Sequence, residues 1–88
     1  MRLAVRVRRA EGDLERLIGL VRRRGWHVVA LEARTTRDGS TMTVHATLEG
    51  DRSPEVLVRQ VQRLIDVEMV HVEEGEAQVA RLAAVREV

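Results

Sequence analysis

Cysteine is absent from the 88 residues of this chain, so neither a disulfide nor a thiolate metal site can form. Tyrosine and phenylalanine are absent too, which leaves Trp26 as the only aromatic residue. Lysine is also missing, because all 15 basic residues are arginine. No apolar run is long enough to cross a membrane, and no leader-like segment opens the chain. These absences predict a cytoplasmic protein without a membrane partner.

The charges are distributed unevenly along the chain. The formal net charge is +1, yet residues 1–37 contain ten arginines and four carboxylates, a balance of +6. Residues 38–88 contain five arginines and ten carboxylates, a balance of −5. The overall composition, 44% hydrophobic and 33% charged, is typical of one globular domain. The opposite charges of the two halves predict an oriented partner surface.

Hydrophobic periodicity predicts six elements of secondary structure. Alternation favours strands over residues 3–7 and 41–48, whereas apolar residues three and four apart favour helices over residues 13–24 and from residue 54. Gly25 suits the left-handed position after the first helix, and Ser53 followed by Pro54 suits the start of the second. A last strand is expected over residues 67–72.

The strand expected over residues 26–36 has an irregular pattern. Val28, Leu31 and Ala33 cannot all share one face of a regular strand, so we expect a bulge near Val29 or Ala30. The order is then βαββαβ, which predicts an α+β, ferredoxin-like fold: a four-stranded antiparallel sheet with two helices on one face. We expect this domain to occupy residues 1–75, followed by a tail over residues 76–88 that forms a short helix or a strand. Many functions share this fold.

The sequence lacks the motifs typical of catalysis, metal binding and RNA binding. No nucleophile and base stand at an informative spacing, and no Gly-rich phosphate loop is present, so we expect no enzymatic activity. The three histidines fall on three different predicted strands at spacings that match no metal signature, so we expect no metal site. The predicted central strands lack the aromatic residues that stack on RNA bases, so we expect no nucleic-acid partner.

The loop before the first helix is the candidate binding site. Free backbone N–H groups at a helix start attract anions, and Gly12 lets a ligand or another backbone approach closely. The alternative is that Gly12 only allows the turn and that Asp13 caps the helix. The candidate residues of this loop are Arg9, Ala10, Glu11, Gly12, Asp13 and Leu14.

Residues 12–28, G-D-L-E-R-L-I-G-L-V-R-R-R-G-W-H-V, resemble the first ACT-domain segment of the small regulatory subunit of acetohydroxyacid synthase, also called acetolactate synthase. That family reads G-x-L-x-R-V-x-G-L-[FV]-x-x-R-G-[YF]-[NH]-[IV]. Residues 64–67, L-I-D-V, are similar to its K-L-[VI]-D-V motif. The resemblance covers residues 3–74 and is nearest to the short, ACT-only form of the subunit. Residues 81–88 are similar to the segment with which long members enter a second domain.

The resemblance implies a noncatalytic regulatory subunit in branched-chain amino-acid biosynthesis. Its partner would be the large subunit, which carries thiamine diphosphate, Mg and FAD, whereas this chain would bind no cofactor. ACT domains of the family pair side by side into an eight-stranded sheet, so we expect a homodimer. The partner surface is predicted at Arg22, Arg23, Trp26 and His27, with the alternative that Trp26 closes one end of the core.

The resemblance also implies an amino-acid effector, bound between the first loop of one chain and His27 and Val28 of the other. Valine-sensitive members have asparagine at the positions of Arg9 and His27, so we expect no feedback by valine. The alternative function is a free-standing homodimeric ACT module that binds an amino acid and regulates a different enzyme.

Overall fold

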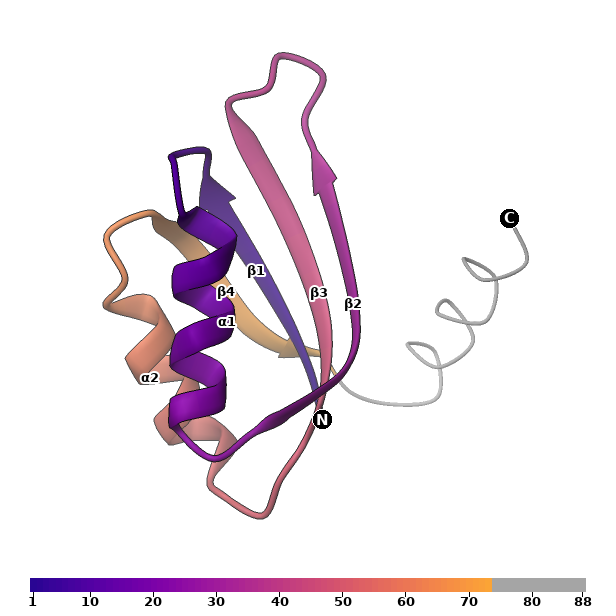
Figure 1. The fold of residues 1–88 in the computed structure, drawn as a ribbon, viewed down its shortest axis with the longest axis vertical. Coiled ribbons are helices and arrows are strands. Elements are labelled where there is room, and N and C mark those ends of the chain that lie inside the picture. Colours follow the sequence, from indigo (N-terminus) through magenta and orange to yellow (C-terminus); the bar gives the residue numbers. More distant parts are fainter. Residues whose placement is uncertain (74–88) are drawn as a thin grey trace, which may run out of the picture.

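The computed structural model describes residues 1–73. The elements are β1 (Arg2–Arg8), α1 (Asp13–Arg23), β2 (His27–Thr35), β3 (Thr41–Glu49), α2 (Pro54–Gln62) and β4 (Val67–Glu73). Strand order in the sheet is β2-β3-β1-β4, and all neighbouring strands are antiparallel. Both helices lie on the same face of the sheet, next to one another (Figure 1). This arrangement confirms the predicted ferredoxin-like α+β fold, whereas the tail predicted over residues 76–88 lies outside the described residues.

The hydrophobic core lies between the helices and the sheet. Alternate side chains of the central strands β1 and β3 point toward the helices and are almost fully buried, as period-two alternation predicts. The helices meet them with residues spaced three and four apart, and burying one such aliphatic side chain is worth about 1.5–3 kcal/mol. The core residues on these elements include Leu3, Val5, Val7, Leu17, Leu20, Val21, Met42, Val44, Leu48, Leu57 and Val61.

Strand β2 contains the predicted bulge. Val28 pairs with Leu48 but Ala30 pairs with Thr47, so Val29 is the extra residue. Beyond the bulge, Leu31 pairs with Ala46 of the helix-facing side of β3. The bulge therefore places Val28, Leu31 and Ala33 on one face, as expected from their spacing.

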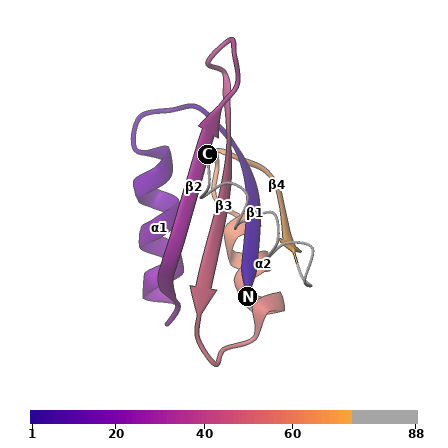
Figure 2. The same ribbon diagram turned by 90° about the vertical axis from the view of Figure 1, so that its right-hand side faces the viewer.

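Strand β2 is also an edge strand, and helix α1 covers only part of it. The hairpin that joins β2 to β3 extends beyond the ends of the helices (Figure 1), and Figure 2 shows β2 along the near edge of the sheet. Leu31 is 39% exposed and Val29 is 53% exposed. This edge thus combines apolar side chains with a row of backbone groups that no strand within residues 1–73 pairs.

The predicted helix ends are confirmed in position. Gly25 has a φ of 90° and follows the last turn of α1, where its N–H donates to the Arg22 carbonyl at 3.1 Å. Ser53 precedes α2 and Pro54 is its first residue, although the Ser53 hydroxyl makes no capping hydrogen bond. Neither helix within residues 1–73 is long and apolar enough to cross a membrane.

Candidate functional site

The loop between β1 and α1 is closed by a carboxylate of the chain itself. Gly12, with a φ of 77°, is the residue that precedes the helix, and Asp13 is the first helical residue rather than the cap. The Asp13 carboxylate is buried and turns back over the loop. Its Oδ1 accepts from the Leu14 N–H at 2.6 Å, and its Oδ2 accepts from the Ala10 N–H at 3.2 Å. Two N–H groups that we expected to be free for an external anion are therefore already bonded.

Arg9 completes this arrangement. Its Nε donates to Asp13 Oδ2 at 3.1 Å, and its Nη1 donates to the hydroxyl of Thr35, at the end of β2, at 3.0 Å. Burial raises the pKa of the Asp13 carboxyl, but the hydrogen bonds from Ala10 and Leu14 and the charge of Arg9 outweigh burial. The pKa of Asp13 therefore lies below its ordinary value of 3.8. Arg9 is thus tied to the loop and to β2 of the same chain.

Arg16 holds the other side of the loop. Its Nη1 donates to the Glu11 carbonyl at 2.9 Å, and its Nη2 forms an ion pair with Asp66 in the turn before β4. A Cβ atom at Gly12 would lie 2.9 Å from Arg16 Nη1. The positive φ therefore favours glycine here, and a side chain at this position would also displace the Arg16 guanidinium.

Sequence reasoning missed the pair formed by Arg16 and Asp66. Both residues belong to motifs that carry the family resemblance, yet nothing in the sequence indicates that they meet across 50 positions. The backbone brings them together, because the Arg8 N–H donates to the Asp66 carbonyl at 2.7 Å and so places the turn before β4 beside the first loop.

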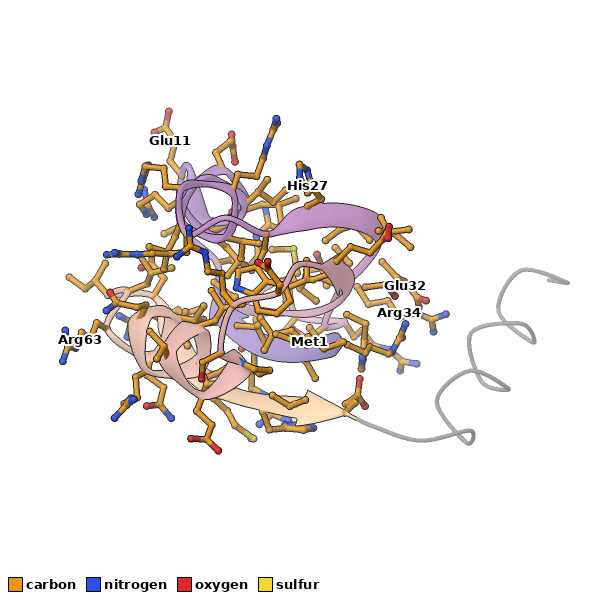
Figure 3. All side chains as sticks on the ribbon, turned by 90° about the horizontal axis from the view of Figure 1, so that it is seen from below. Met1, Glu11, His27, Glu32, Arg34 and Arg63 are labelled. Atoms are coloured by element: carbon orange, nitrogen blue, oxygen red, sulfur yellow. The ribbon has the colours of Figure 1, made fainter. Side chains whose placement is uncertain are left out.

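The two parts of the predicted effector site do not meet within one chain. The loop precedes α1, whereas His27 and Val28 follow it, and an 11-residue helix is about 16 Å long. His27 is exposed and Val28 is half-buried. Figure 3 shows the side chains of Glu11 and His27 pointing away from the core. The effector site therefore stays a prediction about two chains.

Trp26, for which the sequence allowed either a partner contact or a place closing one end of the core, lies in the core. Its side chain is 4% exposed, whereas Arg22 and Arg23 beside it are exposed. A Cβ atom at Gly50 would lie 2.8 Å from Trp26 Cε3, so the indole packs on a backbone that has no side chain at that point. The structure thus supports the alternative in which Trp26 closes the end of the core.

Comparison with known proteins agrees with this architecture. The family model described as "ACT domain" matches residues 9–70, which include the first loop, both helices and most of the sheet. The chain belongs to the ACT-domain family.

Two curated relatives are similar to this ACT domain in sequence. The acetolactate synthase isozyme 2 small subunits of Escherichia coli (strain K12) and Shigella flexneri are each 33% identical to it over 54 residues. The match covers 61% of this chain and 62% of each relative, less than two thirds of either length.

Two solved structures share the fold of the ACT domain. The C-terminal domain of the MgtC protein from Mycobacterium tuberculosis superposes with a TM-score of 0.64 at 20% identity, over 85% of each chain. Formyltetrahydrofolate deformylase from Burkholderia mallei superposes with a TM-score of 0.63 at 17% identity, over 80% of this chain and 27% of that one. At these identities the likeness concerns the fold.

The histidines of the ACT domain lie apart from the first loop. Ala4 of β1 pairs with His45 on one side and His71 on the other, so both histidines share the face of the sheet opposite the helices. His45 Nδ1 lies 2.7 Å from Glu73 Oε1. Burial raises the pKa of Glu73, but His45, Arg2 and His71 outweigh burial, so the pKa lies below its ordinary value of 4.5. Within residues 1–73, no three His, Asp or Glu side chains are placed to hold a metal ion.

Proposed function

We propose that this ACT domain is the noncatalytic small subunit of an acetolactate synthase and acts in branched-chain amino-acid biosynthesis. The observation that carries the proposal is the 33% identity to the isozyme 2 small subunits. Catalysis, with thiamine diphosphate, Mg and FAD, then belongs to the large subunit. Docking raises activity because the small subunit binds the active conformation of the large subunit more tightly than the inactive one.

We propose further that two copies pair through β2. Strand β2 is an edge with exposed Val29 and Leu31, features that favour extension of the sheet by a second strand. An antiparallel pair of β2 strands brings the start of one strand beside the end of the other. The partner's His27 then approaches Thr35, to which Arg9 of the first loop is bonded. This geometry supports a site shared between two chains.

We expect this shared site not to respond to valine. The Asp13 carboxylate already occupies two N–H groups of the loop, and the Arg9 guanidinium beside it repels an ammonium group. A charged hydrogen bond is worth about 1.5–3 kcal/mol, whereas micromolar binding needs about 8 kcal/mol. The contacts that remain in the loop are therefore too few for a tight effector.

Reconstitution with a large subunit tests the proposal. The purified chain is mixed with an acetolactate synthase large subunit, and acetolactate formation is measured with and without valine. We expect co-purification and a rise in activity that valine does not reverse. The charge reversals Arg22→Glu and Arg23→Glu should weaken the activation, and Arg63→Glu at the end of α2 is the matched control.

The opposite result favours the alternative function. No activation of any acetolactate synthase large subunit, combined with calorimetric binding of an amino acid to a stable homodimer, would identify a free-standing ACT module instead.

A further inference from the structure

A hollow of about 320 Å³ lies where α1 ends and α2 begins. Figure 1 shows these two helix ends side by side at the lower end of the molecule, and Figure 3 views the molecule from that end. The hollow is separate from the first loop, which lies at the other end of α1. Its lining residues are Arg24, Trp26, Arg52, Ser53, Val56 and Leu57.

One wall of the hollow is apolar. Trp26 and Leu57 line this wall and belong to the hydrophobic core, where they are 4% and 1% exposed. Val56, which is 45% exposed, adds an apolar side chain at the mouth. An aromatic ring together with two branched side chains favours an apolar body of a few carbon atoms.

The other lining residues that the structure describes are Arg24, Arg52 and Ser53, none of which carries a carboxylate. Arg24 Nη2 donates to the amide oxygen of Gln60 at 3.0 Å, a neutral acceptor that leaves the guanidinium charge uncompensated. Arg52 makes no hydrogen bond or ion pair with the residues that the structure describes. Its side chain lies against Gly25, where an added Cβ would be 3.3 Å from Arg52 Nε. Among residues 1–73, the two guanidinium groups that border the apolar wall thus have no partner anion.

We propose that this hollow binds a carboxylate carried on a small apolar body. Guanidinium groups match the planar carboxylate and form charge-assisted hydrogen bonds with it. The apolar body lies against Trp26 and Leu57. The volume is near the lower end of the range for small-molecule sites, about 300–1,000 Å³, which favours a branched acid of five or six carbons over a nucleotide.

Intrinsic fluorescence provides a direct test, because Trp26 is the only aromatic residue of the chain and lines the hollow. The probes are 3-methylbutanoate, its uncharged isostere 3-methylbutanamide, and the peptide acetyl-Ala-Ala-Val with a free carboxyl terminus. We expect a saturable change of Trp26 emission with a carboxylate probe and none with the amide. Binding of the free acid alone would indicate a metabolite, and binding of the peptide alone would indicate a protein segment.

Variants assign the binding to the two arginines. The double substitution Arg24→Gln with Arg52→Gln should weaken binding by at least about tenfold, because two charged hydrogen bonds are lost. Arg63→Gln, on the exposed end of α2, is the matched control and should bind as the unmodified chain does. Circular dichroism verifies that each variant is folded. The Trp26 indole N–H resonance in a ¹H–¹⁵N spectrum provides a second readout of binding at the same place.

Three results would overturn the proposal: no saturable response to either carboxylate probe, equal binding of the amide, or unchanged affinity of the double variant. None of these measurements involves a large subunit. A failure here therefore leaves the proposed subunit function untouched, and a failure of reconstitution leaves this site untouched.

Discussion

Gly12 shows how one residue without a side chain serves two purposes. Its φ of 77° is unfavourable for other residues, and the Arg16 guanidinium occupies the space where a side chain would begin. We expect Gly12→Ala to lower the free energy of unfolding by about 1–3 kcal/mol for backbone strain, and by about 1 kcal/mol more because Arg16 loses its bond to Glu11. Urea denaturation measures both contributions together.

A substitution at Gly39 separates the backbone strain from the loss of the Arg16 hydrogen bond. It has a φ of 79° and open space around it, so Gly39→Ala reports the strain alone. In an Arg16→Ala background, Gly12→Ala should then cost no more than Gly39→Ala does. If Gly12→Ala and Gly39→Ala lower the free energy of unfolding equally in the otherwise unmodified chain, the hydrogen bond from Arg16 to Glu11 does not depend on Gly12.

The buried carboxylate of Asp13 makes the fold sensitive to acid. Since its pKa in the folded chain lies below 3.8, ionised Asp13 stabilises the fold fully above that value, and this contribution is lost as the pH falls through the lowered pKa. We expect Asp13→Asn to lower the free energy of unfolding by about 1–3 kcal/mol at neutral pH. The difference from the unmodified chain should narrow below pH 3.8.

Asp51 supplies the matched control, because it is exposed and forms none of the ion pairs among residues 1–73. Asp51→Asn should change stability by less than about 0.5 kcal/mol. If the free energy of unfolding of Asp13→Asn differs from that of the unmodified chain by the same amount from neutral to acid pH, the role of the ionised carboxylate is contradicted.

At the scale of elements, the exposed edge β2 is the expected dimer contact. Leu31→Asp places a charge on the helix-facing side of this edge, where burial against a second copy would be costly. We expect sedimentation to show a monomer that keeps its fold. Ile65→Asp is the control: Ile65 is 81% exposed and lies in the turn before β4, so this variant should associate as the unmodified chain does.

The elements themselves could be predicted because their signals are local. Alternation in β1 and β3, apolar spacing in the helices and even the bulge at Val29 follow from which neighbouring side chains must share a face. The first loop is different, since its closure depends on Asp13 turning back and on Arg16 reaching Asp66, a contact set by the packing of distant elements. The sequence allows two positions for Trp26, because nothing in it indicates that the indole packs against the backbone of Gly50.

At the scale of the whole molecule, the uneven charge predicts how association of two copies depends on salt. The balance of +6 lies on residues 1–37, which include the central strand β1 and the two elements expected to face a second copy, α1 and β2. Repulsion between two such surfaces weakens as salt shortens the screening length, about 10 Å at 0.1 M. We therefore expect the homodimer to tighten as salt is raised, measured by sedimentation, and a dimer indifferent to salt would argue against pairing through these elements.

The bulge at Val29 also determines which changes of length the strand tolerates during evolution. Removing this one residue leaves Val28 opposite Leu48 and Ala30 opposite Thr47, so the strand becomes regular while Leu31 and Ala33 still face the helices. Removing one residue after the bulge instead reverses the orientation of every later side chain of β2. A single deletion should therefore be accepted at the bulge, whereas insertions and deletions further along the strand should come in pairs, and the hairpin turn after Thr35 is free of that restriction.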